Sequence, residues 1–221
     1  MPVWSKLFCA DYVKRDSAMN RRSFLLFAAP LLLLPQSAFA QLLRGEAAAK
    51  ALAEVGRAVN AITRLQGQFR QTNPDASVVS GTFYLSRPGK VRFEYDAPSP
   101  LLLLADGRNV ILQDRRLRTT DRYPLRQTPL YFLLKAKVDL AKDVRVTAVE
   151  TRGDKLAITL TDAKREADGA LSLIFNQPDM QLLEWTLRDR QGRATRVQLL
   201  DAQMGPAISA ALFADPSPRR R

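Results

Sequence analysis

Apolar residues recur along the chain at two different spacings, and each spacing predicts a different kind of secondary structure. Within residues 45–66 they follow one another at intervals of three or four, which places them on one side of a helix. The residues of this stripe are Leu52, Val55, Val59, Ile62 and Leu65. The pattern therefore predicts an amphipathic helix over 45–66 that ends at Gly67.

Beyond Gly67 the apolar positions alternate with polar ones, which is typical of strands with one buried face. The alternating residues are Phe83 and Leu85; Val91, Phe93 and Tyr95; Leu156, Ile158 and Leu160; Leu171, Leu173 and Phe175; Leu183, Trp185 and Leu187; and Val197 and Leu199. Turn-forming pairs such as Asp106-Gly107 and Gly153-Asp154 separate these runs. About ten short strands joined in this way predict one meandering antiparallel sheet within a single domain.

Residues 128–135 interrupt the alternation with a dense apolar run that follows Pro129. Proline fits the first turn of a helix because its missing N–H is not needed there, so the segment is predicted to be a helix of about two turns. A sheet with one apolar face must cover that face, and a large twisted sheet tends to curl. The two helices can then lie over its opening, above an interior that is either filled, as most cores are, or hollow.

The first forty residues have the pattern of an export signal. Arg21 and Arg22 precede an apolar run over 24–34, and Ala38-Phe39-Ala40 follows as a cleavage site. The run is shorter than the ~20 residues that a membrane span requires, which favours cleavage after Ala40 over an uncleaved anchor. The paired arginines fit the Sec route and the twin-arginine route alike.

Processing decides which residues belong to the folded protein. Met19 begins a signal of ordinary length, so it is the expected start of translation. Cleavage leaves a folded domain at 41–215 and a basic, disordered tail at 216–221, and the expected location is the periplasm of a bacterium. It also removes Cys9, the single cysteine, so no thiol remains for a lipid anchor.

Composition argues against catalysis. The chain has no histidine and one cysteine, which excludes a histidine-dependent triad, a histidine-ligated metal and a disulfide within the chain. It also lacks a Gly-x-Ser-x-Gly elbow, and no pair of carboxylates is recognisable as an acid and a base. We therefore expect a protein that is not an enzyme and that has neither a cofactor nor a metal. If the protein is an enzyme after all, a periplasmic hydrolase is the alternative.

The net charge is +12. Removal of the first forty residues takes five of the 34 basic and two of the 22 acidic residues, which leaves 29 and 20 and a net charge of +9. No nucleic-acid recognition motif accompanies this charge, so nucleic acid is not an expected partner. Anionic membranes attract basic residues by ~1 kcal/mol each, so Arg115, Arg116 and Arg118 form either a solvated face or a surface for transient membrane contact.

Residues 81–107 combine three short motifs in a fixed order. Gly81-Thr-Phe-Tyr-Leu-Ser-Arg87-Pro88-Gly89 leads into Val91-Arg-Phe93-Glu-Tyr95, and Leu101-Leu-Leu-Leu-Ala-Asp106-Gly107 follows Pro98. This sequence resembles the central signature of the LolA family of periplasmic lipoprotein carriers. The resemblance extends to Phe69-Arg-Gln71, Thr128-Pro129-Leu130 and Ala211-Leu212-Phe213, and so spans nearly all of residues 41–215.

The resemblance implies a fold and a set of partners. The fold is mainly β with lid helices: a half-open antiparallel β-barrel of about eleven strands that encloses a hydrophobic cavity. An N-terminal helix and a short central helix cover it. The implied protein is a monomeric chaperone that receives triacylated lipoproteins from an inner-membrane ABC-type lipoprotein-releasing complex. It delivers them to an outer-membrane lipoprotein receptor. A lipoprotein-sensing regulator of the same superfamily is the alternative, although such sensors usually carry a second domain.

The resemblance also implies roles for individual residues. Arg87 occupies the place of an arginine that bonds to the lid and holds it shut, and its alternation with Phe83 and Leu85 points it toward the cavity; the alternative is a solvated turn arginine. The expected cavity residues, each of which could equally be ordinary core, are Val59, Ile62, Phe69, Phe83, Leu85, Phe93, Tyr95, Leu102, Leu104, Leu130, Leu133, Leu134 and Trp185. The run 101–104 is apolar on both strand faces, so one face should meet the cavity and the other a covering element. The pattern fits either choice of inward face, and Leu102 and Leu104 are taken as the inward pair.

Overall fold

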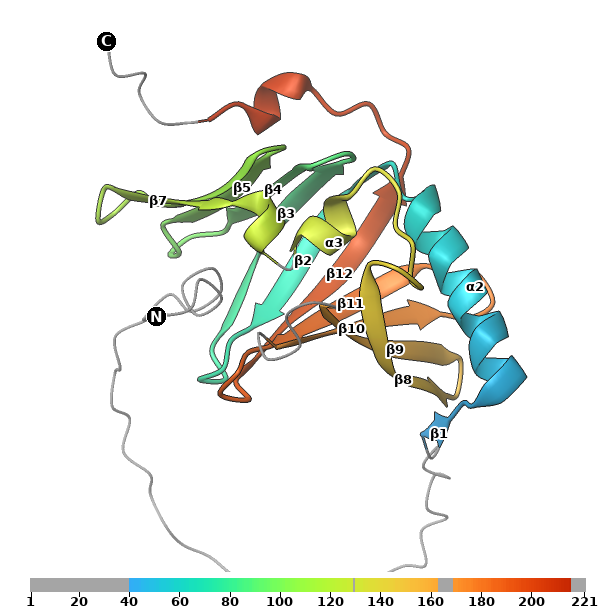
Figure 1. Ribbon diagram of the computed structural model, residues 1–221. Helices are drawn as coiled ribbons and strands as arrows, with labels where there is room; N and C mark the ends of the chain where they lie inside the picture. The colour runs from blue at the N-terminus through green and yellow to red at the C-terminus, as the bar shows by residue number, and fades with distance from the viewer. Residues whose placement is uncertain (1–39, 129, 163–168, 216–221) are drawn as a thin grey trace, which may run out of the picture.

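Twelve strands form one antiparallel sheet in the computed structural model, which describes residues 40–128, 130–162 and 169–215. The strands are β1 Gln41–Leu42, β2 Arg64–Thr72, β3 Val78–Ser86, β4 Lys90–Tyr95, β5 Leu101–Asp106, β6 Asn109–Asp114, β7 Thr119–Pro124, β8 Val144–Arg152, β9 Lys155–Asp162, β10 Ala170–Asn176, β11 Leu182–Arg188 and β12 Ala194–Met204. Their order is β1-β8-β9-β10-β11-β12-β2-β3-β4-β5-β6-β7, with β1 and β7 at the two edges. The sheet curls without closing, which confirms the predicted half-open barrel (Figure 1). The export signal and the tail 216–221 lie outside the described residues.

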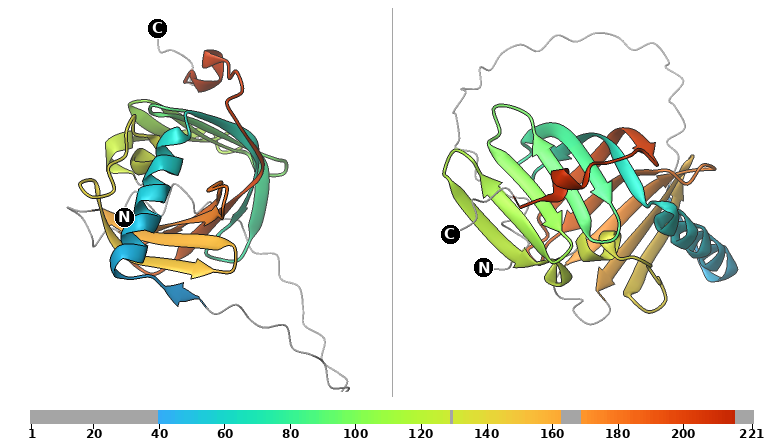
Figure 2. Two further views of the ribbon diagram at one scale, coloured as in Figure 1. Left: turned by 90° about the vertical axis from the view of Figure 1, so that its right-hand side faces the viewer. Right: turned by 90° about the horizontal axis from the view of Figure 1, so that it is seen from above.

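The helix α2, Gly45–Ala61, crosses the opening of the curled sheet (Figure 2, left). Its buried residues, Ala51, Val55 and Val59, recur every four positions and face the interior. The prediction of a helix to residue 66 is wrong, because the backbone leaves the helical conformation at Ile62. Leu65 continues the helical spacing only by coincidence, since it lies in β2 and pairs with Leu85 of β3.

The segment between β7 and β8 contains the second predicted helix. A 3-10 turn, η1 Leu125–Gln127, leads into the short helix α3, Leu130–Leu134, which has five residues rather than about two turns. Leu130, Leu133 and Leu134 are all buried, and α3 lies over the interior of the sheet beside α2 (Figure 1). Two helices therefore cover the barrel, and we call α2 and α3 together the lid.

Strand β5 is buried on both of its faces. Leu103 pairs with Phe93 and joins the main core, whereas Leu104 packs with Ile111 and Phe213 in a separate cluster outside the barrel. The cover on the outer face is a 3-10 helix near the C-terminus, η3 Ala210–Phe213, which lies across β4 and β5 (Figure 2, right). The choice of Leu102 and Leu104 as the inward pair was therefore wrong, because Leu102 pairs with Glu94 and not with Phe93.

Candidate functional site

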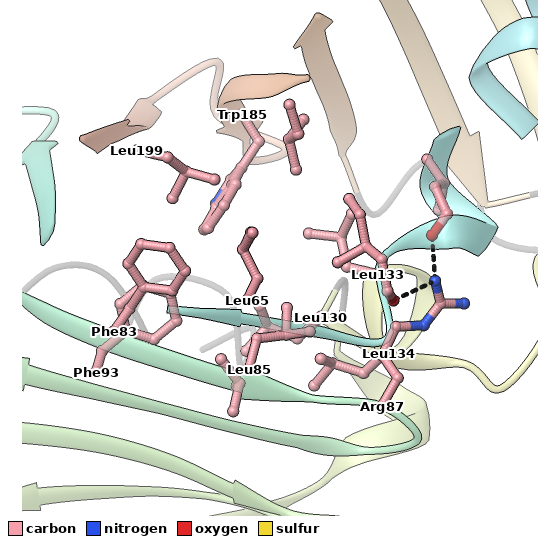
Figure 3. A pocket seen from close by; sticks show the side chains of 14 residues that line it. Leu65, Phe83, Leu85, Arg87, Phe93, Leu130, Leu133, Leu134, Trp185 and Leu199 are labelled. Atoms are coloured by element: carbon pink, nitrogen blue, oxygen red, sulfur yellow. Dashed lines mark hydrogen bonds between the residues drawn. The ribbon is translucent and has the colours of Figure 1, made fainter. Parts of the chain in front are cut away.

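An apolar pocket lies between the lid and the inner face of the sheet (Figure 3). Its lining residues are Val59, Ile62, Leu65, Phe83, Leu85, Arg87, Val91, Phe93, Leu130, Leu133, Leu134, Leu182, Trp185 and Leu199. Arg87 is the one charged residue of this set. The pocket has a volume of only about 20 Å³, just above the ~10–15 Å³ that a cavity needs to hold one water molecule. In this conformation the side chains of the lid fill the interior.

Aromatic rings form the floor of the pocket. The ring of Phe93 stacks at 6.0 Å on that of Phe83 and meets Trp185 edge to face, also at 6.0 Å. Phe69 lies behind Phe93 at 5.0 Å and contacts Tyr95 at 5.1 Å, so both belong to the core without lining the pocket. Burial raises the pKa of the Tyr95 phenol, which donates a hydrogen bond of 2.9 Å to Gln71 Oε1 and is therefore neutral.

The structure gathers most of the predicted cavity residues around this pocket. Those that line it are Val59, Ile62, Phe83, Leu85, Phe93, Leu130, Leu133, Leu134 and Trp185, together with Arg87. Phe69 belongs to the core and the partly buried Tyr95 packs against it, and neither they nor Leu102 and Leu104 line the pocket.

Sequence reasoning missed four lining residues: Leu65, Val91, Leu182 and Leu199. Alternation with Phe93 could have identified Val91, and alternation along β12 could have identified Leu199. Leu182 could not be found in this way, because the pairing of β10 with β11 shifts and leaves Leu183 without a partner in β10. The regular pattern points to Leu183, whereas the irregularity turns Leu182 inward.

The guanidinium of Arg87 binds the C-terminal ends of both lid helices. Its Nε donates to the carbonyl of Lys135 at 2.7 Å, and Nη2 donates to the same oxygen. Its Nη1 donates to the carbonyl of Val59 and, at 3.3 Å, to that of Ile62. Figure 3 shows the guanidinium at the edge of the pocket, with dashed lines to the two of these carbonyls that belong to lining residues.

These acceptors explain why an arginine lies here. The last carbonyls of a helix have no partner within the helix, and they carry the negative end of its dipole. Neither α2 nor α3 has a basic residue in its own last turn, so the positive charge comes from the turn between β3 and β4. Burial lowers the pKa of Arg87, but an arginine keeps its charge at neutral pH.

The backbone of the same turn adds two further bonds to the lid. The N–H of Arg87 donates to Thr63 O, and the N–H of Gly89 donates to Leu134 O, each at 2.8 Å. Gly89 has a φ of +80°, and a Cβ at this position would come within 2.7 Å of the Cα of Gly107. Only glycine fits this turn, which therefore holds the ends of both helices by side chain and backbone together.

A second set of contacts joins α2 to the segment that follows α3. Asn60 Nδ2 donates to Val138 O at 2.9 Å, and the N–H of Val138 donates back to Asn60 Oδ1 at 2.8 Å. Lys135 forms an ion pair with Asp143, whose second oxygen accepts the N–H of Asp139 at 2.8 Å. The two parts of the lid are thus tied to each other as well as to Arg87.

Replacing Asn60 with alanine is expected to loosen this connection. The change removes both bonds to Val138 and should cost about 1–3 kcal/mol, since the two backbone groups lose their partners. Hydrogen exchange measures the effect directly: the amide of Val138 should exchange faster while amides in β3 and β4 keep their protection. Unchanged exchange at Val138 would contradict the assigned contact.

The ion pair with Lys135 makes the lid sensitive to acid. Burial alone would raise the pKa of Asp143, but the hydrogen bonds and charges of Lys135 and its neighbours outweigh it and lower the pKa below 3.8. A carboxyl whose pKa is lower in the folded state stabilises the fold above its unfolded value, and this contribution is lost as the pH falls through the folded value. We expect protection of residues 135–143 to decrease as the pH falls below about 4, and Asp143→Asn to abolish this dependence.

The pocket differs from a metal or acid–base site in the side chains that line it. Its lining is hydrocarbon and aromatic apart from one arginine. Within residues 40–128, 130–162 and 169–215, no group of three or more Asp, Glu, Cys or His side chains is placed to hold a metal ion. In the same ranges, no helix is both long and apolar enough to cross a membrane.

Comparison with known proteins points to one family. The family model described as outer membrane lipoprotein carrier protein LolA matches residues 60–215. An outer-membrane lipoprotein carrier protein from Methylobacillus flagellatus is 29% identical over 158 residues, which cover 67% of this chain and 76% of that protein. A protein of the same name from Legionella pneumophila (strain Corby) is 30% identical over 165 residues, covering 70% of this chain and 80% of that protein.

The solved structures that match this chain are more distant from it in sequence. A LolA superfamily protein from Nitrosomonas europaea is 11% identical, with coverage of 74% of this chain and 97% of that chain and a TM-score of 0.42. The complex of MucA and MucB from Pseudomonas aeruginosa matches at 17% identity, 76% of this chain, 61% of that chain and a TM-score of 0.42. Neither likeness is close enough in sequence to carry information about function.

Proposed function

This chain belongs to the LolA family, since the family model covers residues 60–215, and on that premise we propose that it carries acylated lipoproteins across the periplasm. The cargo leaves an inner-membrane ABC-type lipoprotein-releasing complex, and its acyl chains are shielded in the pocket beneath the lid. The carrier then delivers it to the outer membrane, where a receptor accepts it. The observation that supports this proposal most directly is an apolar interior at whose edge one half-buried arginine binds the ends of both lid helices.

An apolar interior is what such a cargo requires. Transfer of an acyl chain out of water contributes ~0.8 kcal/mol per CH₂ group, so an acylated protein does not leave a membrane unaided. The hydrocarbon and aromatic lining of the pocket offers the same kind of contact as the membrane interior. Thirteen of its fourteen residues contribute apolar side chains, and the lid covers them.

The closed lid accounts for release. Cargo can enter only if the bonds from Arg87 to Val59, Ile62 and Lys135 break. The free energy of those bonds is then subtracted from the affinity for cargo, and it is recovered when the lid closes after delivery. A carrier with this arrangement binds lipoprotein strongly enough to remove it from one membrane and weakly enough to give it to an acceptor.

Native mass spectrometry of the periplasmic protein tests the proposal. The protein is purified without detergent from cells that express a triacylated lipoprotein, and we expect a complex with the mass of carrier plus intact lipoprotein. The matched control is the same lipoprotein with its acylated cysteine replaced by alanine, which should not copurify. Equal recovery of both cargo forms would show that binding does not depend on acyl chains and would exclude the proposed function.

A further inference from the structure

An open groove runs along the C-terminal half of α2, on the side that faces the turn between β10 and β11. Its apolar lining comes from Ala58 and Ala61 of α2 on one wall and from Met180, Ala202 and Met204 on the other, and Glu54, Arg57 and Asp179 add charged side chains. Its volume is about 710 Å³, which lies within the range of roughly 300–1,000 Å³ found for sites that bind small organic ligands. Figure 1 shows α2 beside the strands β10 and β11 that end at this groove.

The groove and the interior pocket are neighbours that share a wall. Ile62, Leu65 and Leu182 line both of them, so only these three side chains separate the groove from the pocket. Each is buried, with exposed fractions of 8%, 4% and 7%. We call these three residues the gate.

The gate is connected to Arg87. The carbonyl of Ile62 accepts a hydrogen bond from Arg87 Nη1 at 3.3 Å, and the N–H of Arg87 donates to the next residue, Thr63, at 2.8 Å. Ile62 is also the residue at which α2 ends. Release of the guanidinium therefore frees the backbone of the residue whose side chain divides the two spaces.

The volumes of the interior pocket and of the groove indicate which of the two an acyl chain can occupy first. The interior has room for about one water molecule while the lid is closed, whereas the groove is already open. Methionines on its outer wall are unbranched and flexible, so they adapt to ligands of different shape. An acyl chain can thus lie in the groove before the interior has opened.

We propose that this groove is the portal through which an acyl chain of the cargo reaches the interior, past the gate formed by Ile62, Leu65 and Leu182. The inference rests on the proposed carrier function and adds a route to it. The chain first lies between α2 and the β10–β11 turn. It then replaces the contacts of the gate when Arg87 releases Ile62.

A portal controls how fast cargo associates and dissociates but leaves the dissociation constant unchanged. Measuring both quantities therefore tests the proposal. Loading of the full protein with a fluorescent tripalmitoyl lipopeptide is followed by stopped flow, and the dissociation constant is measured separately. Ala61→Trp and Met204→Trp narrow the groove from opposite walls, at exposed positions that tolerate a larger side chain. Each variant should slow association and dissociation about tenfold. Its dissociation constant should stay within about twofold of that of the unmodified protein.

Ala53→Trp is the matched control, because Ala53 is an exposed residue of α2 that does not line the groove. Its rates should equal those of the unmodified protein.

Leu182→Ala widens the gate and should accelerate both association and dissociation. Loading at the normal rate by both groove variants would overturn the portal, as would a changed dissociation constant at normal rates. If the unmodified protein fails to bind the lipopeptide, the carrier function itself is refuted, which is a separate outcome.

Discussion

Replacing Arg87 with leucine is expected to yield a folded protein that takes up acylated lipoprotein and fails to release it. Leucine preserves an apolar edge for the pocket but donates no hydrogen bond to Val59, Ile62 or Lys135. Hydrogen bonds to a charged group contribute about 1.5–3 kcal/mol each, so the closed empty state loses at least that much. Because this cost no longer opposes loading, affinity for cargo should rise about tenfold or more.

Transfer of radiolabelled lipoprotein from the loaded carrier to outer-membrane vesicles measures the effect. Arg92→Leu is the matched control, because Arg92 lies on the neighbouring strand β4 and donates to Leu212 O outside the barrel at 2.9 Å. That variant should release its cargo normally. Arg87→Lys keeps the charge without the forked geometry and should give an intermediate result. Normal transfer by Arg87→Leu would show that this arginine does not hold the lid.

The largest loss of stability is expected for Phe93→Ala. Phe93 is 4% exposed and contacts the rings of Phe69, Phe83 and Trp185, so it is the centre of the aromatic floor. Truncation of a buried phenylalanine to alanine costs about 3–5 kcal/mol, through lost burial and the cavity that remains. Urea denaturation should show a lower midpoint in proportion, with an unchanged slope.

Phe93→Leu is the control for this prediction. It keeps most of the volume and should cost less than about 1.5 kcal/mol. A loss below about 1 kcal/mol for Phe93→Ala would mean that neighbouring side chains fill the space, in which case the floor of the pocket is more mobile than its ring contacts indicate.

Much of the fold could be predicted from local pattern. Alternation located most strands, because each has one face toward the interior and one toward solvent, as in the run from Leu156 to Leu160. The dense apolar run after Pro129 identified α3 because all of its leucines are buried. The position of Arg87 on the inner face followed from its alternation with Phe83 and Leu85.

The errors arose where a non-local contact decides the outcome. The inward face of β5 depends on its register with β4, and nothing within residues 101–104 distinguishes Leu103 from Leu104. Leu182 faces inward because of an irregular pairing between two strands. The groove beside α2 is formed by segments that are more than a hundred residues apart in the chain, so no local pattern could reveal it.

The C-terminal segment that crosses the outside of the barrel restrains the part of the sheet around β5, whereas in the described part of the chain the lid helices carry no such cover. With Leu103 packed inside and Leu104 covered by Phe213 outside, β5 cannot shift without disturbing two cores at once. Arg87 follows β3 directly, and β3 is joined to β5 through β4. The arginine that binds the lid is therefore attached to the part of the sheet that β5 and Phe213 hold in place. When the bonds from Arg87 to the lid break, the helices and their connecting segments must supply the movement, and the sheet stays fixed while they move.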